Sequence, residues 1–248
     1  MVGIHRSALK YGIEPREGVD YNVIECRDCV RGVSILEDNT IDLVLTAPPY
    51  DSSLVTNFEE YKEFLRVTFY LAYNKLVDGG RCVVSLPSKV LVNGKKIYLI
   101  SHFNLLMEEI GYTFQEDIIW EQSDTKDYVL VYTKSAQEDK GAEEEIVTKY
   151  NKDKGMLPDK GVIPDKGIWK INSVGEKNGV TPFPVGLSDR VITQYSKEGE
   201  LVLDFFIGTG TTAISCIKHN RKYIGYDNNQ SLVDLSKTLI ERYQSQNK

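Results

Sequence analysis

The chain has 248 residues, of which 41 % are hydrophobic, so it is long enough for one α/β domain with a substantial core. A net charge of −6 excludes a protein that is basic over its whole surface, although a local basic surface can exist within an acidic total. No run of about 18 apolar residues is present, and the first residues lack the apolar stretch of a signal peptide. We therefore expect a cytoplasmic protein without a membrane span.

The four cysteines do not have the spacing of a metal site. Cys26 and Cys29 form one CxxC pair, but no second pair of cysteines or histidines accompanies it. Cys82 and Cys216 stand alone in apolar or mixed segments. Reduced thiols and no metal are the expected state.

The first half of the chain alternates segments typical of strands and helices. Residues 21–30 indicate a short strand that runs into a helix, and Ile41–Thr46 is a continuous apolar strand. An amphipathic helix is predicted at 58–76, ended by Asp78-Gly79-Gly80, and a strand follows at 81–86. A helix at about 98–110 ends at Gly111, and strands are predicted at 114–120 and 128–132. This alternation predicts a doubly wound, mostly parallel sheet.

Residues 134–168 differ in composition from the rest of the chain. They are polar and contain a repeat, DKGMLP from Asp153, DKGVIP from Asp159 and DKGIW from Asp165, which favours successive turns. Two interpretations stay open: a solvent-exposed, partly mobile segment without a binding role, or an insertion that recognises the substrate. Its lysines, Lys134 among them, are placed to touch phosphates, but nearly as many acids accompany them. The chain is thus divided into 1–133, the 134–168 insertion, and 169–248, where the two outer segments form one domain.

The segment from 201 to 227 predicts a nucleotide site. A strand at 201–205 contains Asp204, a glycine turn follows at 208–212, and a helix is expected at 211–219. A strand at 222–226 precedes Asp227, whose carboxylate suits the two hydroxyls of a ribose, and a last helix is expected at 232–244. The turn lacks the third glycine of a dinucleotide site and the lysine of a P-loop. Asp204 would repel a pyrophosphate but attract a cationic amino group, which favours S-adenosylmethionine over NAD or ATP.

A second unusual feature is the sequence Ala47-Pro48-Pro49-Tyr50 directly after the strand at Ile41–Thr46. Two prolines make a stiff corner at a carboxyl strand end, where open α/β sheets bind ligands. Such a corner presents backbone carbonyls in a fixed direction, and the tyrosine presents a flat ring. A base taken out of a duplex needs these features, although a purely structural turn has the same sequence.

Together these segments resemble the β-group amino-methyltransferases of DNA, which make N4-methylcytosine or N6-methyladenine in restriction-modification systems. The catalytic motif of that family is (Ser/Asp/Asn)-Pro-Pro-(Tyr/Phe), and its cofactor motif is similar to DFFIGTGTT from Asp204 to Thr212. RKYIGYD, the TPFP segment at 181–184 with Leu187 and Arg190, and Asp28-Cys29 also resemble family segments. The His-Pro that usually introduces the TPFP segment is absent. The catalytic motif precedes the cofactor motif, which is the β-group order, and the resemblance spans about 21–243.

The resemblance implies a Rossmann-like fold, S-adenosylmethionine as cofactor and double-stranded DNA with a flipped base as partner. A homodimer remains open. The implied catalytic residues are Ala47, Pro48, Pro49 and Tyr50. The implied cofactor residues are Asp28, Cys29, Thr46, Pro182, Phe183, Pro184, Asp204, Phe205, Phe206, Gly208, Gly210, Thr211, Thr212 and Asp227.

Ala47 departs from the family pattern. The family places a hydrogen-bonding side chain there, which with the Pro48 carbonyl accepts hydrogen bonds from the target amine. Loss of such a partner can cost on the order of 10²–10³ in rate. Ala47 is then either an engineered inactivating change or a natural weakening, and Ser, Asp or Asn at this position should raise the rate.

Three functional hypotheses follow from the resemblance. Thr-Ala-Pro-Pro-Tyr is closer to the Thr-Ser-Pro-Pro-Tyr of cytosine-N4 enzymes than to the Asp-Pro-Pro-Tyr of adenine-N6 enzymes, so N4 of cytosine is favoured and N6 of adenine is the alternative. A second hypothesis keeps the fold and changes the substrate to RNA or to protein glutamine. A third is a cofactor-binding protein without turnover, which Ala47 makes a real alternative.

Overall fold

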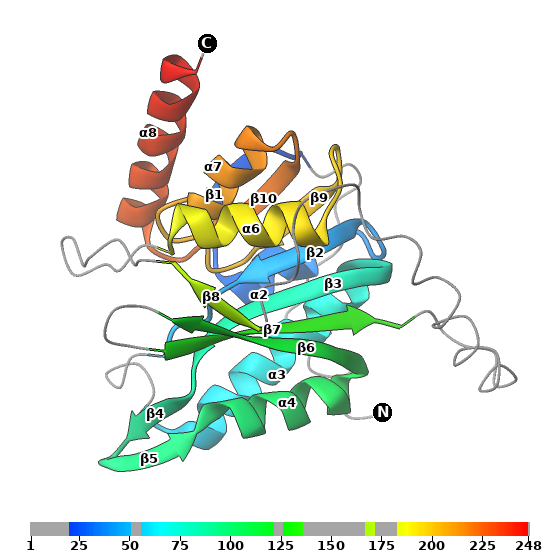
Figure 1. The fold of residues 1–248 in the computed structure, drawn as a ribbon, viewed down its shortest axis with the longest axis vertical. Helices are drawn as coiled ribbons and strands as arrows, with labels where there is room; N and C mark the ends of the chain where they lie inside the picture. The colour runs from blue at the N-terminus through cyan, green and yellow to red at the C-terminus, as the bar shows by residue number, and fades with distance from the viewer. Residues whose placement is uncertain (1–19, 51–55, 122–125, 136–166, 172–182, 248) are drawn as a thin grey trace, which may run out of the picture.

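Among the described residues, the centre of the molecule is an eight-stranded sheet (Figure 1). A computed structural model describes residues 20–50, 56–121, 126–135, 167–171 and 183–247. The strands lie in the order β1 (Val23–Cys26), β10 (Lys222–Asp227), β9 (Leu201–Asp204), β2 (Ile41–Thr46), β3 (Leu76–Pro87), β7 (Lys126–Lys134), β6 (Tyr112–Glu121) and β8 (Ile168–Lys170).

The sheet is mostly parallel, as predicted. The five strands from β1 to β3 run parallel to one another, β7 is antiparallel to both β3 and β6, and β8 is parallel to β6. Strand β2 lies in the middle, and every one of its side chains except Asp42 is buried. This explains its unbroken apolar sequence, since a central strand of such a sheet is covered on both faces.

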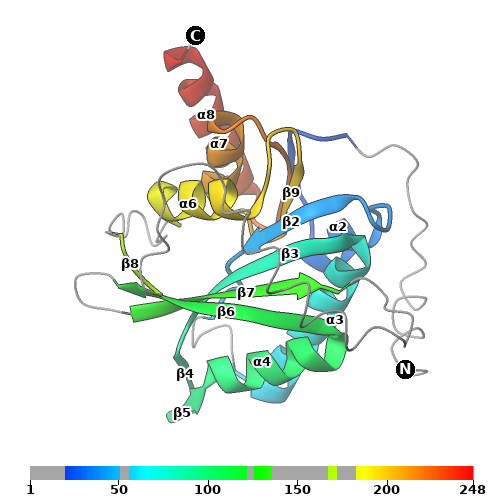
Figure 2. The same cartoon turned by 45° about the vertical axis from the view of Figure 1, so that its right-hand side comes forward.

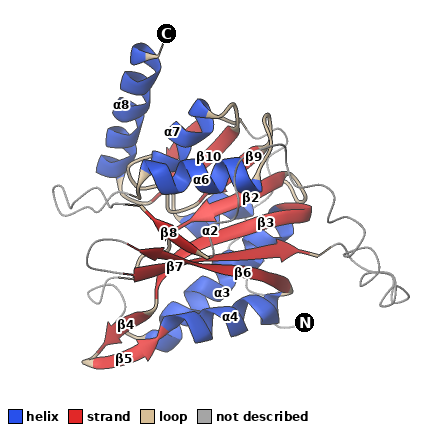
Figure 3. Ribbon diagram, in the orientation of Figure 1, coloured by secondary structure: helices blue, strands red, loops and turns tan. Residues whose placement is uncertain are grey.

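Helices cover the two faces of the sheet and make the fold doubly wound and Rossmann-like (Figure 2; Figure 3). One face carries α2 (Cys29–Ser34), α3 (Phe58–Lys75) and α4 (Leu99–Ile110), and its core includes Phe69 and Phe103, whose rings meet edge to face at 5.1 Å. The other face carries α6 (Val185–Tyr195), α7 (Thr211–Lys218) and α8 (Gln230–Gln246), with Leu187 and Val191 in its core. The two apolar clusters therefore sandwich the sheet.

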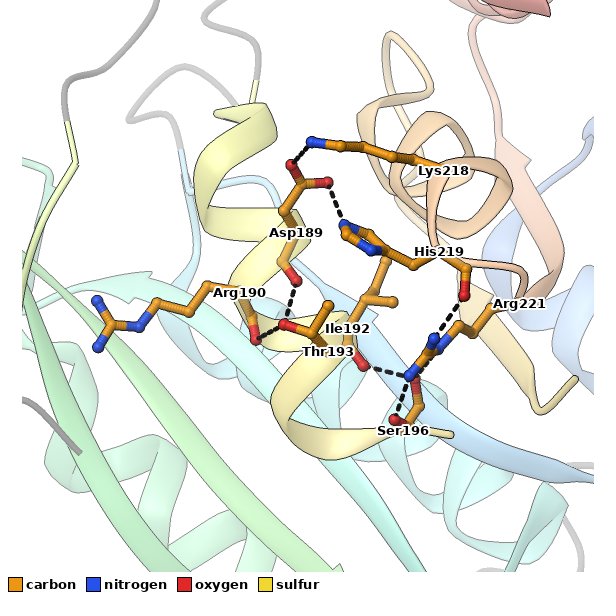
Figure 4. Close-up of polar contacts among 8 residues, drawn as sticks. All are labelled: Asp189, Arg190, Ile192, Thr193, Ser196, Lys218, His219 and Arg221. Carbon is orange, nitrogen blue, oxygen red and sulfur yellow. Dashed lines mark hydrogen bonds and ion pairs between the residues drawn. The ribbon is translucent and has the colours of Figure 1, made fainter. Parts of the chain in front are cut away.

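Helix α6 is bound to α7 by a group of charged side chains (Figure 4). Asp189 of α6 lies 2.5 Å from Nζ of Lys218 and 3.2 Å from Nε2 of His219. Arg221 donates to the hydroxyl of Ser196 at 3.1 Å and to its carbonyl oxygen at 2.6 Å. These contacts hold α6 and Ser196, which follows it, against α7 and the residues after it.

The main differences from the sequence prediction occur at glycine and asparagine. Strand β3 begins at Leu76 rather than at residue 81, because Gly79, at φ +77°, lets the chain bulge and continue pairing with β2. The hairpin of β4 (Lys89–Val92) and β5 (Lys95–Tyr98) was not predicted, although Asn93-Gly94, both at positive φ, is a strong hairpin signal. Strand β8 was also missed.

Helix α6 was likewise not predicted, although its sequence carries the signal. The buried residues Leu187, Val191, Ile192 and Tyr195 recur at helical spacing over one face. Pro184 precedes the first helical residue, and its carbonyl oxygen accepts the first hydrogen bonds of the helix.

The proposed insertion lies mostly outside the described residues, since 136–166 and with them most of the repeat are not described. Its predicted first residue, Lys134, ends β7 and is 8 % exposed. Its Nζ donates to Oδ1 of Asn39 and to the carbonyl oxygen of Leu76, both at 2.7 Å. The prediction that Lys134 is placed to touch phosphates is therefore wrong, because the side chain is held inside the domain.

Candidate functional site

A cavity of about 570 Å³ opens at the carboxyl ends of β2, β3 and β9. Parallel strands end together at this edge, so residues far apart in sequence meet there. The lining residues come from the Pro-Pro-Tyr corner, the end of β3, the start of β7 and the glycine turn. They are Leu45, Thr46, Ala47, Pro48, Pro49, Tyr50, Ser85, Leu86, Pro87, Trp120, Asp127, Phe183, Asp204, Phe206, Ile207, Gly208, Thr209, Thr211 and Thr212.

The Ala-Pro-Pro-Tyr corner lies where β2 leaves the sheet. Thr46 is still paired with Val84 of β3, so the corner begins at Ala47. Pro48 is buried, Ala47 is half-buried, and Tyr50 keeps 43 % of its surface exposed at the rim of the cavity. The methyl side chain of Ala47 offers no hydrogen-bond acceptor to the cavity, as the sequence indicated.

Asp204, the last residue of β9, is the buried acid of the cavity. Oδ1 accepts from the hydroxyl of Thr46 at 2.8 Å and from the backbone N–H of Phe206 at 3.1 Å, and Oδ2 accepts from the hydroxyl of Thr212 at 2.7 Å. Burial raises the pKa of this carboxyl to about 6, although the three hydrogen bonds act in the opposite direction. A cationic group in the cavity would restore the charged form.

The glycine turn brings backbone to the cavity where side chains would obstruct it. Gly208, at φ +52°, donates its N–H to Oδ2 of Asp227 at 3.0 Å. Gly210, at φ +82°, precedes α7, and a Cβ there would lie 2.8 Å from Cβ of Ser236. The position of Gly210 therefore requires glycine, whereas Gly208 has a left-handed φ that glycine adopts without strain. The start of α7 faces the cavity through Thr211 and Thr212.

The predicted cofactor residues Asp28 and Cys29, which follow β1, and Asp227, which ends β10, are not in the cavity lining. Cys26 and Asp227 are paired at the ends of these strands, which places Asp28 next to Asp227 at the same sheet edge. Asp28 caps α2 by accepting from the backbone N–H of Arg31 at 3.1 Å. The Cys29 thiol is buried, which raises its pKa to about 12, so it is an inert core group.

Two neighbouring phenylalanines have different roles. Phe205 is fully buried and packs edge to face on Phe69 at 5.3 Å, so its side chain belongs to the core and not to the cavity. Phe206 lines the cavity, as does Phe183, whose ring lies 6.2 Å from that of Trp120. Pro184 is buried at the start of α6, and Pro182 lies outside the described residues.

Several lining residues do not belong to the predicted site, and three of them, Ser85, Trp120 and Asp127, come from strands on the β3 side of the sheet. Ser85 and Asp127 come from β3 and β7, and Trp120 comes from β6. Asp127 stands opposite both Pro87 and Trp120 in the sheet. Its position just before a predicted strand was a usable signal, but the antiparallel pairing that brings it to the cavity was not visible in the sequence.

Neither a metal centre nor a membrane helix is found in the part of the chain that the structure describes. No group of three or more His, Cys, Asp or Glu side chains there is arranged to hold a metal ion. No described helix is both long enough and apolar enough to cross a bilayer.

Comparison with known proteins agrees with the geometry. Residues 41–238 match the DNA methylase (N6_N4_Mtase) family model, and this span contains both the Pro-Pro-Tyr corner and the glycine turn. The chain is 26 % identical to the type II methyltransferase M.HpaI of Haemophilus parainfluenzae, over 87 % of this chain and 73 % of that protein. It is also 26 % identical to the type II methyltransferase M1.MboII of Moraxella bovis, over 90 % of this chain and 98 % of that protein.

Solved structures share the fold. A putative DNA modification methylase of Thermus thermophilus, complexed with S-adenosyl-L-methionine, has a TM-score of 0.68 at 22 % identity, over 89 % of this chain and 93 % of that one. The cytosine-N4-specific PvuII DNA methyltransferase has a TM-score of 0.67 at 17 % identity, over 94 % and 92 % of the two chains. With the catalytic corner preceding the glycine turn, the chain belongs to the DNA methylase family, as a β-group amino-methyltransferase of the restriction-modification type.

Proposed function

We propose that this protein transfers a methyl group from S-adenosylmethionine to an exocyclic amine of a DNA base, N4 of cytosine. The observation that carries the proposal is one cavity lined by both the Pro-Pro-Tyr corner and the buried Asp204 with its glycine turn. A methyl donor and an amine acceptor must meet in line, and this arrangement provides a place for each side by side.

The residues on the β9 side fit S-adenosylmethionine. The buried Asp204 carboxylate gives a cationic amino group a partner, and its three hydrogen bonds fix its position. The glycine turn and the start of α7 supply close backbone approach without the positive side chain that a pyrophosphate would need. When bound, the cofactor supplies an electrophilic methyl group on a sulfonium. The related Thermus protein with this cofactor supports the assignment.

The residues on the β2 side fit an extruded base. The Pro48 carbonyl, held by a rigid corner, accepts a hydrogen bond from the amine and directs its lone pair toward the methyl group. The half-exposed ring of Tyr50 gives the base a face on which to stack, and Trp120 and Phe183 make another wall apolar. Positioning and electrostatics are sufficient for this transfer.

N4 of cytosine is preferred over N6 of adenine on the sequence of the corner. Thr46-Ala47-Pro48-Pro49-Tyr50 differs at one position from the corner that the cytosine enzymes favour. The structural neighbour that is named cytosine-N4-specific supports this choice. The family model includes both N4-cytosine and N6-adenine methyltransferases, so N6-methyladenine as the product would correct the choice of cytosine.

Target recognition is assigned to the segment between β7 and β8. This segment leaves β7 at Lys134, the end of the strand away from Asp127, and returns to the domain at β8, where Trp169 pairs with Trp120 of the cavity lining. A segment attached there can contact the duplex around the extruded base. Its sequence holds the lysines and the turn repeat that a groove-reading element would use.

Tritium transfer from S-adenosylmethionine to double-stranded DNA tests the proposed function. We expect label in DNA with the wild-type chain and none with Asp204→Ala. We also expect no label in RNA or protein offered in parallel. Cofactor binding without label in any acceptor, in the wild type and in Ala47→Ser alike, would favour a binding protein without turnover and contradict the proposal.

A further inference from the structure

Ala47 leaves the target amine with one acceptor fewer than the reaction needs. An exocyclic amine has two N–H bonds, and localising its lone pair requires that both be directed to acceptors. The Pro48 carbonyl provides one. A second acceptor in this chain must come from another part of the cavity wall.

The polar side chains of the glycine turn and the Asp204 carboxylate lie on the cofactor side of the cavity. The hydroxyls of Thr46 and Thr212 donate to Asp204, and the Asp204 carboxylate accepts three hydrogen bonds on the cofactor side of the cavity. On the side of the Pro-Pro-Tyr corner, the polar side chains of the described lining are those of Tyr50, Ser85 and Asp127, and the carboxylate of Asp127 can accept several hydrogen bonds at once.

Sheet register places Asp127 at the mouth of the cavity beside the corner. Strand β7 runs antiparallel to β3, so its first residues lie at the carboxyl ends of β2 and β3. Asp127 is opposite Pro87, whereas Ser85, two residues deeper, is opposite Val129 and only 5 % exposed. Residues that are paired across two strands, and residues two apart along one strand, project from the same face of a sheet. The side chains of Ser85 and Asp127 therefore lie on the same face, the one that borders the cavity.

Asp127 and Tyr50 line the same cavity, and the charge of Asp127 acts on the Tyr50 phenol. The pKa of the Tyr50 phenol is raised by burial first and by the negative charge of Asp127 second. Tyr50 is also the ring on which the extruded base would stack, so Asp127 borders the space that the base would fill.

We infer that Asp127 supplies the second acceptor for the target amine, in place of the side chain that Ala47 lacks. The inference rests on the proposed function. The amine nitrogen uses its lone pair to bond to the methyl carbon while the methyl carbon–sulfur bond breaks and its electron pair stays on sulfur. The nitrogen then carries one extra proton, which it releases to solvent after the transfer. Asp127 is thus a catalytic residue for this chain, contributed by a strand outside the Pro-Pro-Tyr motif.

Four variants in one single-turnover assay test the inference: Asp127→Ala, Asp127→Asn, Ala47→Asp, and Ala47→Asp combined with Asp127→Ala. Asp127→Ala should lower the methylation rate by about 10²–10³, the cost of removing one preorganised partner, with unchanged affinity for S-adenosylmethionine. Asp127→Asn should retain most of the rate, because its amide oxygen still accepts a hydrogen bond. Ala47→Asp should restore the rate in the Asp127→Ala chain but change it less than about tenfold in the wild type, where an acceptor is already in place.

The controls separate this inference from the proposed function. Asp117→Ala, an exposed acid of β6 outside the cavity, should leave the rate unchanged. A fully active Asp127→Ala chain, or a loss seen only with Ser85→Ala, would overturn the role of Asp127 and leave the function intact. An inactive wild type beside an active Ala47→Asp chain would also overturn it. Inactivity of every chain, with cofactor still bound, would overturn the proposed function itself.

Discussion

The hydroxyl of Thr46 donates a hydrogen bond of 2.8 Å to Oδ1 of Asp204, a residue 158 positions later in the chain. Thr46 ends β2 directly before the Pro-Pro-Tyr corner, and Asp204 ends β9 directly before the glycine turn. The bond is buried and joins neighbouring parallel strands. It therefore fixes the distance between the amine side and the cofactor side of the cavity.

Thr46→Val should weaken the fold at this junction. The change keeps the shape but leaves the buried Asp204 carboxylate with one donor fewer, which typically costs about 1–3 kcal/mol. Urea unfolding at neutral pH measures the difference in free energy of unfolding. Thr193→Val, at an exposed hydroxyl of α6, is the matched control. Equal losses in the two variants would mean that the Thr46–Asp204 bond adds no stability.

Stability without cofactor should fall as pH rises through the titration of Asp204. The pKa of this carboxyl in the folded chain is about 6, above its ordinary value of 3.8, so the folded state holds the proton more tightly. Its stabilising contribution is complete below about pH 4 and lost above about pH 6, a change of about 3 kcal/mol. Urea unfolding of wild type and Asp204→Asn across this range measures it, since the neutral amide does not titrate. Parallel pH profiles would contradict the assignment.

Affinity for S-adenosylmethionine should show the opposite pH dependence. A cationic amino group beside Asp204 favours the carboxylate, so binding below about pH 6 must expel a proton and should weaken by up to tenfold per pH unit. Calorimetry in buffers of different ionisation enthalpy measures the proton release. Proton uptake on binding, or no release at all, would place the amino group elsewhere.

Gly210→Ala should disrupt the glycine turn more than the same change at Gly199. Both glycines have nearly the same positive φ, +82° at Gly210 and +83° at Gly199. A Cβ added at Gly210 would lie 2.8 Å from Ser236, whereas a Cβ added at Gly199 would have no neighbouring atom within 4 Å. Gly199→Ala should cost about 1–2 kcal/mol from the backbone alone. Gly210→Ala should cost about 1–3 kcal/mol more and abolish cofactor binding, because α7 or α8 must shift. Thermal unfolding and equilibrium binding of the two variants provide the comparison.

Most of the α/β framework follows from local sequence. The apolar run of β2 and the periodicity of α3 are unambiguous signals, and α4 ends at Gly111 as predicted. The hairpin at Asn93-Gly94 and helix α6 also carry clear local signals, a turn with two positive φ values and apolar residues at helical spacing. The start of β3 could not be predicted, because pairing with β2 carries the strand across two glycines that locally favour a break.

The residues of the candidate site also differ in whether local sequence or strand pairing places them in the cavity. Motif residues such as Asp204, Gly208 and Pro48 were identified because their chemistry is local to one strand end. Asp127 was missed because its place in the cavity depends on an antiparallel strand that pairs with β3. Phe205 was assigned to the cofactor by motif alone, whereas the alternation of side chains at the end of β9 sends it into the core.

Mass spectrometry of nucleosides is the most direct test of the central claim that the cavity joins a methyl donor to an exocyclic amine of DNA. Double-stranded DNA is incubated with the chain and S-adenosylmethionine that carries a deuterated methyl group, then digested to nucleosides. The expected product is deuterated N4-methylcytosine. Deuterated N6-methyladenine would correct the choice of base, and label on a ring carbon of the base, or no label while the cofactor is bound, would contradict the claim.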